Sequence, residues 1–403
     1  MSTVIILGDV HIGKGTTIGK SGIGTALNSR VVDQVNLLDW TLEQALDQHS
    51  QHIVVTGDVF EEPKPHPSLI CLFIDWVQKC AANGVQVHVI LGNHDFLRTG
   101  NFYVSPLDIL SHCEVDSFFL YKDIDTLMID STAFTFMPFR DRKAFSCDSN
   151  AAALELLQDS LRYELASIPI TYTKVLVGHF ALEGSIPVGD EIDDITNELF
   201  CPISMFKGYD FVWMGHVHKP QVMSKQPYVC HIGSMDLSNF GENEQEKYIV
   251  VFDTELLSYT EIQLPTRPLT KVNITVPKDT KDTTQFVLDE IEKSKPILDK
   301  AIVRLEISLS SPELASVDRS RIEKFIYSKG AFNIAVFSES KKLALIVKDK
   351  DDVTTIDTTL DVNSAIKKWA DKRYPDKLDE DKKKKFIELS LKLIARLKNE
   401  SKE

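Results

Sequence analysis

The chain has 403 residues, of which 43% are hydrophobic and 26% are charged. This composition excludes a disordered, collagen-like or fibrous chain, and the length indicates two or three folded domains. The formal net charge of −14 is unfavourable for binding nucleic acid through the general surface. A polyanion would therefore have to be held by local basic groups or by bound cations.

Five predicted strands share one pattern, in which a short apolar run is followed by Gly and then by a residue that can bind a metal. The runs cover residues 4–7, 53–56, 87–91, 174–177 and 211–214. The residues after the glycines are Asp9, Asp58, Asn93, His179 and His216. Runs that are apolar on both faces are typical of strands buried in a sheet. Because ligands of open α/β sheets collect at the carboxyl ends of the strands, we expect the five loops to converge.

Segments of helical periodicity separate these strands. Helices are predicted at 31–48, 68–83 and 151–166. Alternating strands and helices predict a layered α/β domain. Residues 126–139 and 248–264 alternate like strands and are expected to complete a second sheet. The predicted fold class is therefore α/β, a two-sheet sandwich flanked by helices.

A smaller unit is predicted after Arg267 and Pro268. It contains strands at 271–276, 301–309, 332–338 and 342–347 and helices at 284–294 and 318–328. Residues 349–361 are polar and weakly periodic, which indicates a linker. The predicted organisation is a main domain at 1–266, a small α+β capping domain at 267–348, the linker, and a helical tail at 362–403.

The candidate ligands include two pairs with a spacing of two residues. Asp9 precedes His11, and His216 precedes His218, in the same way. On an extended chain such pairs lie on the same side, so both members can hold one ion. A single histidine after a strand is more often an ordinary polar residue, but five loops with the same pattern favour a metal site. The set is too large for one tetrahedral ion and suits two transition-metal ions.

The motifs resemble those of a known family. They read Gly8-Asp9-x-His11, Gly57-Asp58, Gly92-Asn93-His94-Asp95, Gly178-His179 and Gly215-His216-x-His218. Together they are similar to the five motifs of calcineurin-like metallophosphoesterases. Within that superfamily the chain resembles the SbcD-type nuclease subunits of prokaryotic and phage DNA repair complexes.

The resemblance implies a role for each motif residue. One ion would be held by Asp9, His11, Asp58 and His218, and the other by Asp58, Asn93, His179 and His216. Both ions are expected to be Mn²⁺, with Mg²⁺, Co²⁺, Ni²⁺, Fe²⁺ and Zn²⁺ as alternatives. Such a pair activates water and neutralises a phosphodiester. His94 would contact the phosphate or protonate the leaving oxygen, and Asp95 would orient its ring. Glu61 occupies a position where some relatives carry His, which leaves one substrate contact open.

The resemblance also implies the substrate. The expected activity is that of a DNA exonuclease at double-strand ends and an endonuclease on single strands or hairpins. Basic residues that could contact the DNA backbone are Lys14, Lys20, Arg30, Arg98 and Arg140, although each could equally be a solvated surface charge. Two alternatives stay open: a stand-alone phosphodiesterase for small cyclic nucleotides, and a non-catalytic scaffold.

The expected partners follow from the tail and the absence of targeting signals. The apolar stripe from Phe386 to Leu397 must be covered. It would dock onto an SbcC-type, SMC-like ATPase, or else fold back on its own domain. Relatives suggest a homodimer. The sequence shows no membrane span or signal peptide, and its six scattered cysteines suit a reducing environment, so we expect the cytoplasm of a prokaryotic or phage-infected cell.

Overall fold

The computed structural model describes residues 2–22, 27–99, 102–113, 115, 117–186 and 198–341. The chain divides into two compact units, Met1–Leu343 and Ala344–Glu403. The predicted strand at 342–347, the linker at 349–361 and the tail at 362–403 lie outside the described residues. These assignments and the predicted domain boundaries therefore stay predictions.

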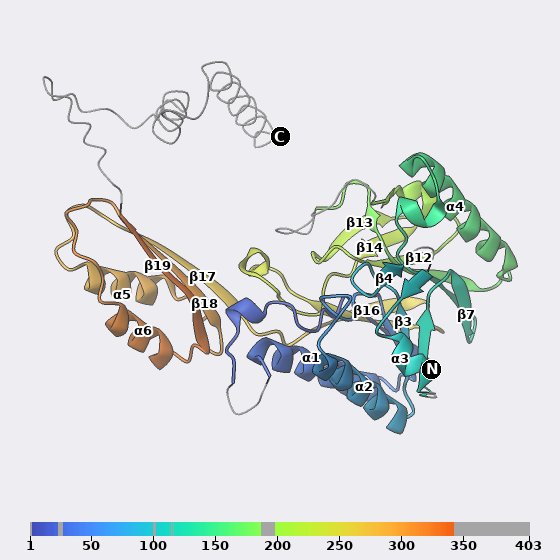
Figure 1. The fold of residues 1–403 in the computed structure, drawn as a ribbon, viewed down its shortest axis with the longest axis horizontal. Coiled ribbons are helices and arrows are strands. Elements are labelled where there is room, and N and C mark those ends of the chain that lie inside the picture. Colours follow the sequence, from blue (N-terminus) through green and yellow to red (C-terminus); the bar gives the residue numbers. More distant parts are fainter. Residues whose placement is uncertain are drawn as a thin grey trace, which may run out of the picture. The chain divides into compact units, whose positions relative to one another are not determined.

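The first sheet carries the N-terminal strands. Its six strands are ordered β16-β15-β1-β2-β3-β6. They are β1 (Thr3–Leu7), β2 (His52–Val55), β3 (Gln86–Ile90), β6 (Phe118–Tyr121), β15 (Tyr248–Asp253) and β16 (Ser258–Gln263). Strands β1, β2, β3 and β6 run parallel, and β15 pairs antiparallel with β1. The carboxyl ends of β1, β2 and β3 therefore meet at one edge of the sheet (Figure 1).

The second sheet has the order β13-β14-β12-β9-β8-β7. Its strands are β7 (Asp125–Ile129), β8 (Thr132–Met137), β9 (Thr173–His179), β12 (Phe211–Gly215), β13 (Gln221–Lys225) and β14 (Tyr228–His231). Parallel pairing of β8, β9, β12 and β14 places the ends of β9 and β12 next to each other.

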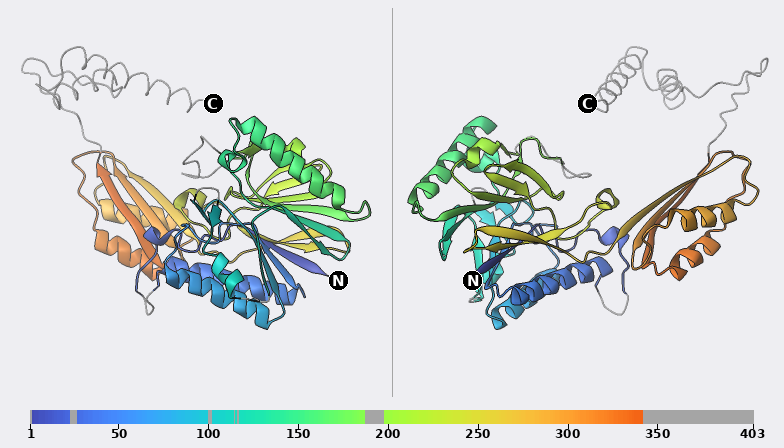
Figure 2. Two further views of the ribbon diagram at one scale, coloured as in Figure 1. Left: turned by 45° about the vertical axis from the view of Figure 1, so that its right-hand side comes forward. Right: turned by 180° about the vertical axis from the view of Figure 1, so that it is seen from behind.

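The two sheets pack face to face, and side-chain alternation decides which residues meet. Val4 and Ile6 of β1 belong to the core between the sheets, together with Trp213 of β12. Ile5 and Leu7 point the other way, toward the helices α1 (Ser29–Asp47) and α2 (Pro67–Ala82). Helix α4 (Asn150–Ser167) covers the outer face of the second sheet (Figure 2). This architecture confirms the predicted fold class of a two-sheet sandwich flanked by helices.

Two predictions about sheet membership are wrong. Residues 248–264 were expected in the second sheet, but β15 and β16 extend the first sheet beside β1. The five ligand-bearing strands were expected at the edge of one sheet, but three lie in the first sheet and two in the second. A strand that is apolar on both faces can occupy the middle of either sheet, so the local pattern does not specify the partner.

Several short elements connect these strands and were not predicted. They are β4 (Leu97–Thr99), β5 (Phe102–Val104), α3 (Asp108–His112), β10 (Ala181–Leu182), β11 (Phe200–Cys201) and the 3-10 helices at Thr16–Ile18, Arg142–Phe145, Ile203–Phe206 and Phe240–Glu242. Among the residues that the structure describes, none of the helices combines the length and apolar character that a membrane span requires.

Residues 269–341 form a three-stranded parallel sheet with two helices on one face (Figure 1). The elements alternate as β17 (Leu269–Val276), α5 (Thr283–Ser294), β18 (Ile302–Leu309), α6 (Arg319–Ser328) and β19 (Asn333–Lys341). Alternate residues of β17 and β18 are buried against the helices. Asp282 and Asp318 cap the two helices by accepting from backbone N–H groups. The arrangement agrees with the predicted α+β character.

Candidate metal centre

Asp9 follows β1 and is fully buried. Thr56 Oγ1 donates to Asp9 Oδ1 at 3.0 Å, and the backbone N–H of His216 donates to Oδ2 at 2.8 Å. The loops after β2 and β12 thus fix the carboxylate that follows β1. Burial raises the pKa of Asp9, because an unpaired charge in the interior is costly.

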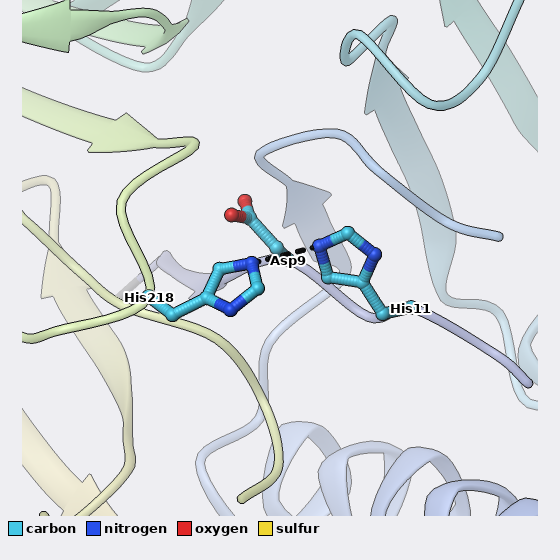
Figure 3. Close-up of side chains that lie close together, drawn as sticks. All are labelled: Asp9, His11 and His218. Atoms are coloured by element: carbon cyan, nitrogen blue, oxygen red, sulfur yellow. Dashed lines mark hydrogen bonds between the residues drawn. The ribbon is translucent and has the colours of Figure 1, made fainter. Parts of the chain in front are cut away.

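His11 and His218 face each other beside Asp9. Their Nε2 atoms lie 2.9 Å apart, and the three side chains form one of the groups that could hold an ion (Figure 3). Burial lowers the pKa of His11 to about 3, so its ring is neutral near pH 7. A neutral imidazole can present an unprotonated nitrogen, which is the form that binds a metal.

Asp58 lies between the two halves of the site. Its Oδ1 accepts from the backbone N–H of His94 at 2.8 Å. Its Oδ2 lies 3.3 Å from His179 Nε2 and 3.5 Å from His11 Nε2. Burial alone would raise the pKa of Asp58, but the adjacent His179 and His94 hold it well below its usual range. One ionised oxygen therefore faces a histidine from each of the two predicted ligand sets.

His179 and His216 form the second half of the site with Asp58. Asn93 Oδ1 lies 2.9 Å from His179 Nε2 and 2.9 Å from His216 Nδ1. His179 Nδ1 donates to the Thr56 carbonyl at 2.8 Å, and His216 Nε2 contacts the Glu198 carboxylate. These outer contacts leave one nitrogen of each ring directed at the same region, as metal-binding histidines require.

The electrostatics of this half show what a cation would replace. Burial would lower the pKa of His179, but Asp58 and Asp9 raise it to about 10. In the protein without ions, a proton on His179 thus balances the buried carboxylates. A divalent cation would displace this proton, so binding is expected to be coupled to proton release.

Backbone conformation at the site is unusual. His11 and Asp58 both have a φ of 49°, in the left-handed region that side chains other than Gly rarely adopt. At Gly92, a Cβ atom would collide with the Asp58 carboxylate. The strain and the close approach are explained if the loops are shaped to bring their donors to one point.

His94 and Asp95 differ from the expected arrangement. His94 Nδ1 contacts the backbone carbonyl of Glu61 at 2.7 Å. Asp95 is buried, and its two oxygens accept from the backbone N–H groups of Val59 and Gly92 at 2.8 and 2.9 Å. The expectation that Asp95 orients the His94 ring is therefore wrong, because the Glu61 carbonyl makes that contact. Asp95 instead joins the loops after β2 and β3, and burial raises its pKa to about 7.

The basic residues expected at the DNA have varied surroundings. Lys14 Nζ lies 3.0 and 3.2 Å from the two carboxylate oxygens of Glu61, beside the site. Lys20 Nζ lies 4.9 Å from the ring centroid of Phe332. Arg140 donates to the Phe139 carbonyl at 2.8 Å and contacts Asp123.

Two further arginines complete this group. Arg30 is fully buried between Asp33 and Asp236, so the expectation that it contacts DNA is wrong. The side chain of Arg98 lies outside the described residues.

Several residues around the site were not predicted to have roles there. They are Thr56 and Glu198, which bond candidate ligands, Glu61, which contacts His11, and the buried pair Glu242 and Lys247. Glu61 stands three residues after Asp58, and that proximity could have drawn attention to it. The others carry no local signal, because only the folded chain brings them to the site.

The donors fit two divalent ions. Two buried histidine nitrogens face one another beside Asp9, while a carboxylate, an amide oxygen and two histidines surround the second position. Imidazole and carboxylate donors suit first-row transition metals. Residues 2–220 match the family of calcineurin-like phosphoesterases.

The chain belongs to the calcineurin-like phosphoesterase family. Membership and the donor set support a metal-dependent hydrolase of phosphoesters with two divalent ions, as the motif resemblance implied. The assignment of individual ligands stays a prediction.

Relatives of this calcineurin-like phosphoesterase include proteins named as nucleases. The chain is 22% identical to SbcD, the smaller-lettered component of the SbcCD nuclease of Escherichia coli (strain K12), over 306 residues, which cover 71% of this chain and 74% of that protein. It is 24% identical to the DNA double-strand break repair protein Mre11 of Methanopyrus kandleri over 218 residues, 53% of this chain and 43% of that protein. A dimetal phosphatase structure from Danio rerio aligns at 11% identity with a TM-score of 0.40, covering 65% of this chain and 98% of that one.

Proposed function

We propose that this phosphoesterase is a DNA nuclease that uses two Mn²⁺ ions and serves as the nuclease component of an SbcCD-like repair and recombination complex. The observation that carries the proposal is the position of Asp58 Oδ2, 3.3 Å from His179 and 3.5 Å from His11. One carboxylate oxygen can thus be shared by two ions. The similarity to the SbcD nuclease over 71% of the chain supports DNA as the substrate.

The ligands divide between two ions. Asp9, His11, Asp58 and His218 would hold the first, and Asp58, Asn93, His179 and His216 the second. When bound, such a pair supplies positive charge for a phosphodiester and activates water as a nucleophile. The chain itself contributes the oxygen contacts that orient the rings: the Thr56 carbonyl for His179 and the Glu198 carboxylate for His216.

His94 is the proposed catalytic acid. Its backbone N–H donates to Asp58, and its ring Nδ1 contacts the Glu61 carbonyl. The carbonyl can only accept, so Nδ1 carries a proton and Nε2 is left for substrate. In the charged form, Nε2 can donate to a phosphate oxygen or protonate the departing sugar oxygen.

DNA contacts must overcome the acidic character of the chain. With a net charge of −14, two divalent ions would supply the main attraction for a phosphodiester. Lys14 lies beside His11 through its contact with Glu61, and residues 267–348 would form the DNA-binding cap. Such contacts read the backbone rather than the bases, so binding should weaken with added salt.

A nuclease assay tests the activity. Purified protein with Mn²⁺ should degrade linear duplex DNA and cleave single-stranded or hairpin DNA, and excess chelator should abolish both activities. Asp58→Asn should be inactive because the shared oxygen is lost. Hydrolysis of cyclic nucleotides without any cleavage of DNA would contradict the proposal.

The partners form the second part of the proposal. Residues 362–403 would dock onto an SbcC-type, SMC-like ATPase, and the nuclease would form a homodimer. A chain truncated after residue 361 should keep Mn²⁺-dependent nuclease activity but no longer co-elute with the ATPase. Unchanged co-elution would refute docking through the tail, and a monomeric mass in solution would refute the dimer.

A further inference from the structure

We propose that Glu61 is a positioning residue that fixes His11 as a metal ligand, because its carboxylate holds the proton of His11 on Nδ1. The inference rests on the ligand set of the proposed function and assigns a role to a side chain outside that set. Glu61 is not one of the proposed ligands of either ion. It lies in the loop after β2, three residues beyond Asp58.

The contacts on the two sides of the His11 ring carry the argument. His11 Nδ1 lies 2.9 Å from Glu61 Oε2. The opposite nitrogen, Nε2, lies 2.9 Å from His218 Nε2 and 3.5 Å from Asp58 Oδ2. A neutral imidazole has a single N–H, and an ionised carboxylate can only accept. The proton therefore resides on Nδ1, and Nε2 presents its lone pair to the first ion.

Lys14 keeps the Glu61 carboxylate in place. The Glu61 side chain is 31% exposed, so it could turn toward solvent without an anchor. Lys14 Nζ lies 3.0 and 3.2 Å from its two oxygens. The result is a chain of three side chains in which Lys14 holds Glu61 and Glu61 holds His11. Partners of this kind behind a ligand typically contribute about 10- to 100-fold in metal affinity.

A third cation among His11, Glu61 and His94 is the competing interpretation, since these side chains are close enough to hold one. The position already has a cation, because the Lys14 ammonium contacts both Glu61 oxygens. A further ion would have to displace Lys14 and also take the Nδ1 proton from His11. The geometry therefore favours orientation of His11 over a third metal.

Glu61 also touches His94, but through a different atom. The backbone carbonyl of Glu61, not its carboxylate, accepts from His94 Nδ1 at 2.7 Å. Substituting the side chain leaves this carbonyl in place. The two contacts can therefore be separated by mutation, and an effect of Glu61 variants on metal binding reports on His11.

The test compares Glu61→Leu and Glu61→Gln with the control Glu62→Gln, which changes the exposed neighbouring carboxylate. Titration calorimetry with Mn²⁺ should show one of the two ions bound about 10- to 100-fold more weakly in Glu61→Leu. Glu61→Gln should lie in between, because an amide oxygen can still accept from Nδ1–H. The control should bind like the wild type.

A second measurement reads the ring directly without metal. In ¹⁵N NMR spectra of the ion-free protein, His11 should be protonated at Nδ1 in the wild type and in Glu62→Gln. In Glu61→Leu it should become a mixture of tautomers. If Glu61→Leu loses stability, the near-isosteric Glu61→Gln still tests the proposal by both measurements.

The outcomes separate the two levels of inference. Wild-type Mn²⁺ affinities and an unchanged His11 tautomer in both Glu61 variants would overturn the role of Glu61 and leave the proposed function intact. A wild-type protein that binds no Mn²⁺ would overturn the ligand set and, with it, the proposed function.

Discussion

Removing the buried cation of Lys247 should destabilise the protein and weaken its metal site together. The Lys247 side chain has no exposed surface. Its Nζ donates to Glu242 Oε2 and to the His218 carbonyl, both at 2.7 Å, and to Ser234 Oγ at 2.9 Å. It therefore joins the candidate ligand His218 to the loop that pairs with Asp9.

The magnitude follows from burial. Lys247→Met keeps the aliphatic stem but leaves the Glu242 charge without its cation in the interior. Breaking a buried ion pair by removing one partner costs about 3–5 kcal/mol. At about 2–4 °C per kcal/mol for a domain of this general size, the Tm should fall by roughly 6–20 °C. Mn²⁺ affinity should fall as well, because the His218 carbonyl loses its donor.

Thermal unfolding and Mn²⁺ titration of four proteins check this reasoning. Lys293→Met removes a lysine that is 76% exposed and should change stability by no more than about 0.5 kcal/mol. The double variant Lys247→Met with Glu242→Gln should recover at least half of the lost stability, because no charge remains buried. A loss below about 1 kcal/mol in Lys247→Met, or no recovery in the double variant, would refute the argument.

Three further predictions concern the site and the core. His94→Ala should reduce nuclease activity by about 10²- to 10⁴-fold while both Mn²⁺ ions stay bound, since its backbone bond to Asp58 is kept; loss of an ion in a metal titration would contradict the catalytic role. Gly92→Ala should abolish Mn²⁺ binding, because a Cβ would collide with Asp58, and calorimetry with wild-type affinity would be the contrary result. Burial lowers the pKa of His88 to about 3, so the unfolded chain binds the extra proton below pH 6.5 and stability falls with decreasing pH. Between pH 7.5 and 5.5, urea unfolding should show about 1.4 kcal/mol less loss in His88→Phe than in the wild type, and equal losses would exclude this residue as a source.

Local sequence signals predicted much of the architecture. Apolar runs ending in Gly marked β1, β2, β3, β9 and β12, and each strand forms where it was expected. The same runs also marked where polar donors follow. The two-sheet fold class and the family resemblance are confirmed, whereas the roles of individual residues stay predictions until metal binding is measured.

The contacts between distant segments were beyond these signals. Glu61 and His11 are separated by 50 positions in the numbering, and Arg30 meets Asp236 across 206. Arg30 appears in the sequence as one more basic residue near the first motif, yet the fold buries it completely. The placement of β15 beside β1 likewise depends on which strands pair, and an apolar pattern does not encode that choice.

The sequence by itself determined the strands, the kinds of donor and the loops that carry them, because these depend on neighbouring residues. Only the tertiary structure decided how the donors divide around Asp58 and which side chains hold the histidine rings. The physical reason is that a ring's proton is placed by whatever lies against its far nitrogen. At His11 and His216 those partners are Glu61 and Glu198, which packing of the two sheets brings into contact.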